Sequence, residues 1–160
     1  MSQTDCICNR CTDACQTRPG WFRPGEAERV ADHLGLTLPQ LFRQYLGVDW
    51  CLDWVRHRVT FGLAPRITTA EGGTEYPADP HGTCIFFQEG RCAIHAVKPY
   101  ECRQMSHADS RLTTSTRRRR LALLWQRSLT QLCQLLGRFP QAQPLTGSQL
   151  STLQTHGVSR

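Results

Sequence analysis

The regularly spaced apolar residues in the first third of the chain predict two short helices. The first covers residues 26 to 34, where apolar positions three and four residues apart form one face, and Gly35 would end it. Thr37 is suited to cap the second helix, and Pro39 is tolerated in its first turn. The apolar stripe of this second helix consists of Leu38, Leu41, Phe42, Tyr45 and Leu46.

The next segment, residues 50 to 69, carries two patterns. The apolar residues at positions 50, 52, 54 and 55 fit a helix, whereas the run at 59–61 favours a strand. Residues 71 to 82 are rich in Gly, Pro and Asp and predict a surface connection.

Two β-favouring runs flank a glycine-bearing turn at residues 88 to 91 and predict a short β-hairpin. This hairpin would bring Cys84 and Cys92 together at its open end. A turn or short helix through residues 98 to 100 then leads to Cys102.

Leucine and tryptophan recur at helical spacing from residue 115 to 137 and predict a long C-terminal helix. Residues 139 to 160 have no such period, and we expect them to be a disordered tail. The predicted fold class is α+β, in one small metal-stapled domain over residues 1 to 138. It combines an N-terminal cysteine knuckle, short helices, a small β-hairpin and the long C-terminal helix.

Nine cysteines in 160 residues point to metal or catalysis more than to disulfides. The number is odd, and the first residues lack the basic start and apolar stretch of a signal peptide, so we expect a cytoplasmic protein. No run approaches the ~20 apolar residues that span a bilayer, so no membrane association is expected.

The cysteines form two blocks. Cys8, Cys11 and Cys15 fall within one stripe of a helix, so three sulfurs could face one metal, whereas Cys6 lies about half a turn away. Cys84, Cys92 and Cys102 form the second block, and His95 and His107 lie close by in sequence. Thiolates suit zinc, iron and iron–sulfur clusters equally, so the choice among these cofactors stays open.

Both blocks resemble the YkgJ-like cysteine-cluster family. The matching segments are Cys-Asn-Arg-Cys-Thr-Asp-Ala-Cys at 8–15, Gly-Thr-Cys-Ile-Phe-Phe at 82–87, Gly-Arg-Cys-Ala-Ile-His at 90–95 and Lys-Pro-Tyr-Glu-Cys-Arg at 98–103. The resemblance covers roughly residues 6 to 107 and implies zinc or iron chelation without an assigned reaction. Ala14 replaces the first of two adjacent cysteines usual in the family, so Cys6 or a histidine, preferably His107, would complete the site.

The other cysteines, histidines and basic residues receive different predictions. Cys51 and Cys133 are expected in the core, and His33, His57, His81 and His156 on the surface. Arg103 is placed to donate a hydrogen bond to a thiolate or a cluster, and so to contact a cofactor. The run of four arginines at 117–120 is expected to be a solvated helix start, because four consecutive helical residues point all round the axis.

The sequence therefore predicts a metal-binding protein whose partner is a metal ion; it names no protein partner. An enzyme, either an iron–sulfur redox protein or a metal-dependent transferase, is an alternative that would use the surplus of ligands. A zinc-stapled nucleic-acid binder is a second alternative based on the arginine run, but nucleic acid is disfavoured because ligating thiolates would cancel most of the formal charge of +6.

Overall fold

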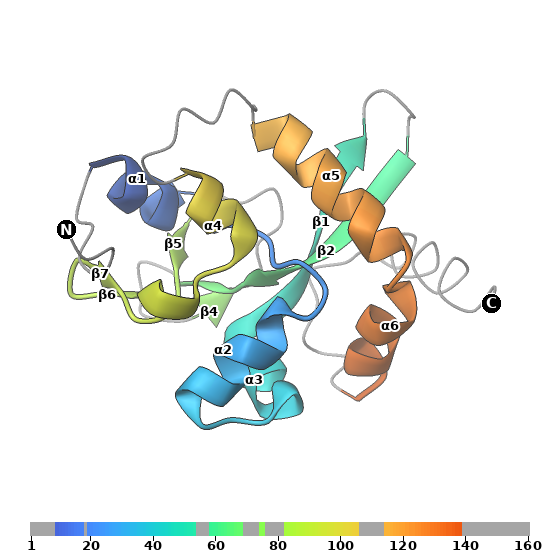
Figure 1. Cartoon of the computed structure of the whole chain (residues 1–160), viewed down its shortest axis with the longest axis horizontal. Coiled ribbons are helices and arrows are strands. Elements are labelled where there is room, and N and C mark those ends of the chain that lie inside the picture. Colours follow the sequence, from blue (N-terminus) through green and yellow to red (C-terminus); the bar gives the residue numbers. More distant parts are fainter. Residues whose placement is uncertain are drawn as a thin grey trace.

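The computed structural model describes residues 9–17, 19–53, 58–68, 74–75, 82–105 and 114–138 (Figure 1). Helices pack against small antiparallel sheets, which confirms the α+β fold class. The elements are α1 (Asn9–Thr17), α2 (Glu26–Leu34), α3 (Leu38–Tyr45), β1 (Leu46–Asp53), β2 (Arg58–Pro65), β3 (Ile67–Thr68), β4 (Thr74–Glu75), β5 (Thr83–Cys84), β6 (Phe87–Gln88), β7 (Arg91–Cys92), the 3-10 helix η1 (His95–Val97), α4 (Tyr100–Met105), α5 (Thr114–Gln126) and α6 (Leu129–Arg138). Among the described residues, no helix is both long and apolar enough to cross a membrane.

Helices α2 and α3 form where the sequence predicts them, except that Leu46, which was expected in the stripe of the second helix, begins strand β1 and pairs with Pro65. Gly35 ends α2 with a left-handed backbone at φ 67°, which glycine adopts without a Cβ penalty. Thr37 begins α3 with a capping box: its amide donates to Gln40 Oε1 at 2.8 Å, and its hydroxyl accepts from the Gln40 amide at 3.4 Å.

The segment after α3 is an antiparallel hairpin of two eight-residue strands, β1 and β2. The predicted strand at 59–61 is confirmed as part of β2, whereas the helical alternative is wrong for residues 50 to 53, which belong to β1. Trp50 pairs with Phe61 across the hairpin. Aromatic and β-branched residues favour such pleated pairs, and the partner strand decides between two patterns that a local reading leaves equal.

The main apolar core lies where α2, α3, the β1–β2 hairpin and the C-terminal helices meet. Figure 1 shows α5 lying along this hairpin, and both α5 and α6 contact β2. The largest fully buried side chains in this cluster are Phe22, Leu41, Phe42, Leu46, Leu63, Phe86, Ile94, Trp125 and Leu132. Two of them, Phe86 and Ile94, come from the cysteine turns described below and join those turns to the core.

The predicted hairpin around residues 88 to 91 is present but shorter than expected. β6 pairs with β7, so that Phe87 rather than Cys84 lies opposite Cys92. Cys84 instead lies in β5 and pairs with Ile67 of the three-stranded sheet β4-β3-β5. The expectation that one hairpin carries both cysteines is therefore wrong, because a strand 17 residues upstream competes for Cys84.

The predicted long C-terminal helix is two helices, α5 and α6, separated at residues 127 and 128. At the break, the Ser128 amide donates to the Trp125 carbonyl at 2.8 Å, and the Gln131 amide donates to the Ser128 carbonyl at 3.0 Å. These bonds span three residues and tighten the chain. Apolar positions 125, 129 and 132 keep helical spacing across the break, which explains why the sequence pattern conceals it.

Candidate metal-binding site

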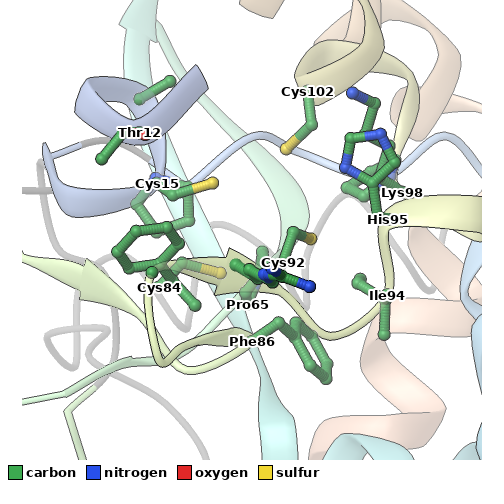
Figure 2. Close-up of a pocket in the computed structure, with 16 residues that line it drawn as sticks. Thr12, Cys15, Pro65, Cys84, Phe86, Cys92, Ile94, His95, Lys98 and Cys102 are labelled. Atoms are coloured by element: carbon green, nitrogen blue, oxygen red, sulfur yellow. The ribbon is translucent and has the colours of Figure 1, made fainter. Parts of the chain in front are cut away.

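Four cysteines from four separate elements line one pocket. Cys15 comes from α1, Cys84 from β5, Cys92 from β7 and Cys102 from α4. In Figure 2 the two helices supply Cys15 and Cys102 on one side of the pocket, and the two short strands supply Cys84 and Cys92 on the other. None of the four forms a disulfide.

The elements that carry these cysteines contact one another directly. Helix α1 packs against both α4 and β5, and α1 and α4 lie next to each other in Figure 1. The Gly82 amide donates to the carbonyl of Thr17, the last residue of α1, at 3.3 Å. This bond ties the approach to Cys84 to the end of the helix that carries Cys15.

The turns that follow Cys84 and Cys92 repeat one arrangement. The sulfur of Cys84 accepts hydrogen bonds from the amides of Phe86 and Phe87, and the sulfur of Cys92 accepts one from the amide of Ile94. Each turn thus aims an amide two residues downstream at its cysteine. Amide donors to sulfur stabilise the thiolate form, which is the form that binds metals.

This repetition has a sequence counterpart. Gly82-Thr-Cys-Ile-Phe and Gly90-Arg-Cys-Ala-Ile share a glycine two residues before the cysteine and a bulky apolar residue two residues after it. The apolar residues, Phe86 and Ile94, are 2% and 1% exposed and hold the two turns in the main core. The two cysteine turns therefore form a short internal repeat in both sequence and structure.

The thiols influence one another electrostatically. A hydrogen bond between Cys15 and Cys92 raises the pKa of Cys15 and lowers that of Cys92, and the other two sulfurs raise the pKa of Cys15 further. Burial raises the pKa of Cys84 to about 12. Burial also raises the pKa of Cys102, with repulsion from Cys84 and Cys92 added. Each thiolate therefore disfavours the formation of further thiolates in the pocket.

The rest of the pocket wall is mainly apolar, with three basic residues. Apart from the cysteines, the lining consists of Thr12, Ala14, Pro19, Pro65, Phe86, Phe87, Gly90, Ile94 and Pro99, and of the basic residues Arg91, His95 and Lys98. Lys98 lowers the pKa of Cys92 through its charge. None of these lining residues, all from the described part of the chain, is a carboxylate.

The four cysteine side chains line the pocket but do not surround a single metal position. In the described segments, no group of three or more His, Cys, Asp or Glu side chains is arranged so that it could hold a metal ion as it stands. The donor set nevertheless suits a metal that is bound by thiolates. Four sulfurs line one pocket, and backbone amides already donate hydrogen bonds to three of them.

The predicted site residues have different outcomes. Of the predicted thiols, the structure brings together Cys15, Cys84, Cys92 and Cys102, and half-buried His95 lies beside them in the pocket wall. Cys6, Cys8 and His107 lie outside the described residues, as does the predicted tail at 139–160. Cys11 lies in α1, but its side chain is outside the described part, as is that of Cys51.

Arg103 follows Cys102 on α4, and its guanidinium contacts helix α2 and the turn that precedes α4. It pairs with Glu26 Oε1 at 2.5 Å and donates to the Lys98 carbonyl at 2.6 Å. Its predicted contact with a thiolate or cofactor stays a prediction. Cys133 is half-buried against the main core, as expected, and lies outside the pocket.

A buried ionic network next to the pocket escaped the sequence prediction. Asp49 of β1 and Glu101 of α4 are 0% and 1% exposed, and Arg118 of α5 lies 3.7 Å from one and 3.6 Å from the other. Trp21 donates its indole N–H to Asp49 at 2.6 Å. Asp49 lies inside the apolar stretch 46–52, and this position was the sequence signal that could have indicated a buried carboxylate with a charged partner.

The arginine run at 117–120 is not the solvated helix start that we expected. Arg117 and Arg118 are 7% and 8% exposed, whereas Arg119 and Arg120 face solvent. Arg118 turns inward because two buried carboxylates from distant segments attract it. The run therefore presents two exposed arginines rather than four.

Comparisons with protein-family models, with curated proteins and with solved structures find no match for this chain. The resemblance to the YkgJ-like cysteine-cluster family accordingly stays a prediction that depends on the cysteine segments alone.

Proposed function

We propose that the protein is a metal-binding module that holds zinc, iron or an iron–sulfur cluster through the thiolates of Cys15, Cys84, Cys92 and Cys102. The observation that carries this proposal is the convergence of four cysteines, from elements up to 87 residues apart, on one pocket. Buried free cysteines scattered through a core would not share a pocket wall or affect one another's pKa values.

Charge and hydrogen bonding support the same conclusion. Burial raises the pKa of Cys102, and the hydrogen bond with Cys92 and burial raise that of Cys15; repulsion from neighbouring sulfurs adds to both. A divalent or cluster cation would offset this repulsion. The amides that donate to Cys84 and Cys92 would remain in place and orient the two sulfurs. Because the sulfurs do not form a closed set, binding would draw them inward, so metal binding and local ordering would be coupled.

The test is metal content after anaerobic purification, with single substitutions inside and outside the pocket. Cys84→Ser and Cys92→Ser should lose more than nine-tenths of the metal bound per chain, because each removes one of four thiolates. Cys133→Ser is the matched control, since Cys133 packs against the main core outside the pocket, and it should bind as much metal as the parent.

Visible absorption then identifies the class of metal. A broad absorbance that bleaches on reduction would indicate iron bound by thiolates, as a single ion or as an iron–sulfur cluster, and a colourless metal-loaded protein would indicate zinc. A parent protein that is fully folded and metal-free, with every thiol titratable, would refute the proposal.

A further inference from the structure

The backbone between α1 and α2 lies directly against α4. The Gly20 amide donates to the sulfur of Cys102, and the next amide, that of Trp21, donates to Glu101 Oε2 at 2.7 Å. Two consecutive amides thus donate hydrogen bonds to two consecutive side chains of α4. One of these side chains lines the cysteine pocket, and the other belongs to the buried ionic network.

This close approach requires glycine at position 20. A Cβ there would lie 2.7 Å from the sulfur of Cys102, 2.8 Å from the Cys102 backbone nitrogen and 3.0 Å from Cβ of Glu101. Real Cβ contacts essentially never fall below 3.0 Å. Any larger residue would therefore push the amide at position 20 away from the sulfur.

Trp21 is fixed by four contacts, and its position determines where the Gly20 amide points. Its indole N–H donates to Asp49 Oδ2 at 2.6 Å, and its backbone amide donates to Glu101. The guanidinium of Arg118 lies 5.3 Å from the ring centroid, within the range of cation–π attraction. The ring also packs onto Gly62, where a Cβ would collide with it.

Arg118 joins the two carboxylates of the network. Its separations of 3.7 Å from Asp49 and 3.6 Å from Glu101 allow charge attraction but exceed hydrogen-bond distance. Within the described part of the chain, Arg118 Nε and Glu101 Oε1 are buried without a hydrogen-bond partner. Apolar residues would fill this volume at lower cost in desolvation, so the network is a weak source of stability and calls for another role.

We propose that Glu101, Asp49 and Arg118 are positioning residues that hold the Gly20–Trp21 backbone so that the Gly20 amide donates to the sulfur of Cys102. The effect of this positioning on a metal depends on the metal-binding function proposed above. An N–H···S bond withdraws electron density from a thiolate ligand, and hydrogen bonds of this kind tune metal affinity and reduction potential. The network would thereby act on the metal centre without touching the metal.

The test compares Glu101→Ala with Glu101→Gln, because the glutamine retains an oxygen that accepts from the Trp21 amide and the alanine does not. Glu89→Ala, at an exposed turn, is the control. In metal-free protein, amide hydrogen exchange at residues 20 and 21 should accelerate at least tenfold in Glu101→Ala. It should stay within about twofold of the parent in Glu101→Gln and in the control.

In metal-loaded protein the probe is cobalt(II), a spectroscopic stand-in for zinc. Glu101→Ala should bind cobalt(II) about tenfold more weakly than Glu101→Gln, the usual scale for loss of an outer hydrogen-bond partner, with a shifted sulfur-to-cobalt band. If Glu101→Ala does not fold, Trp21→Phe, which removes the indole N–H donor together with part of the ring, should accelerate exchange at residue 20 and shift the band in the same direction.

The outcomes separate the two proposals. Unchanged exchange at residues 20 and 21 in the folded variant would overturn the positioning role, whatever the metal result. Faster exchange with an unchanged cobalt(II) affinity and band would overturn its influence on the metal centre. A parent protein that binds no metal would refute the proposed function, while the exchange data would still decide whether the network positions the amide.

Discussion

The two halves of the molecule are held together differently. The apolar half combines α2, α3 and the paired eight-residue strands β1 and β2 around a core of fully buried side chains. The cysteine half consists of the nine-residue helix α1, two-residue strands, one 3-10 turn and the six-residue helix α4. Elements this short are not stable alone. Burial maintains the first half, and it also anchors the second half through Phe86 and Ile94. The proposed metal would add a second source of order to the cysteine half.

The largest expected effect tests the apolar half. Phe42 is 0% exposed in the main core, and Phe42→Ala should lower the free energy of unfolding by about 3–5 kcal/mol through lost burial and a residual cavity. The loss should be the same with and without a metal chelator, as measured by urea unfolding. Leu124→Ala, at an exposed position on α5, should change stability by less than about 0.5 kcal/mol. A loss that disappears after chelation would show that the two halves are not separable.

The next effect concerns Asp49, at the boundary between the halves, where Trp21, Arg118 and Glu101 face its carboxyl group. Burial raises the pKa of Asp49 from 3.8 to about 7, and the charge of Arg118 lowers it only in part. Between pH 4 and 7 the folded protein keeps a proton that the unfolded chain releases. Asp49 therefore contributes stability below pH 4 that is lost as the pH rises through 7.

This loss should appear in a comparison of the parent with Asp49→Asn, which has no carboxyl group to titrate but retains an acceptor for Trp21. Relative to that variant, the parent's free energy of unfolding should fall by up to about 4 kcal/mol between pH 4 and 7. Urea unfolding at several pH values measures both slopes. Parallel curves for the two proteins would contradict a raised pKa at Asp49.

The smallest effect is local to α3. Thr37→Ala removes the side-chain half of the capping box and should lower the free energy of unfolding by about 1 kcal/mol. Gln134→Ala, at an exposed position on α6, is the control and should be close to neutral. An effect of Thr37→Ala on metal content would mean that α3 influences the cysteine half, contrary to the division described above.

Local patterns explain which parts of the fold were predictable. The end of α2 and the start of α3 follow from Gly35 and Thr37, whose conformations and hydrogen bonds involve only neighbouring residues. The helix break at residue 128 and the strand β1 were missed, because apolar spacing continues across the break and Trp50 fits either structure. Tertiary partners decide such cases.

The residues of the site were likewise predictable only where the signal is local in sequence. Clustering along the sequence was enough to select Cys15, Cys84, Cys92 and Cys102, which the fold brings to one pocket. The burial of Arg118 could not be predicted, because its partners Asp49 and Glu101 lie 69 and 17 residues away in sequence. The role of Gly20 depends on an approach to Cys102 that no local pattern encodes.

Amide hydrogen exchange on anaerobically purified protein, before and after removal of metal with a chelator, tests the central claim most directly. We expect chelation to accelerate exchange in residues 82–105 at least tenfold, because a ligand bound only by the ordered state stabilises that state. Exchange in α2 and α3 should remain within about twofold. Unchanged exchange in both halves after chelation would contradict the claim that a shared metal orders the four cysteines.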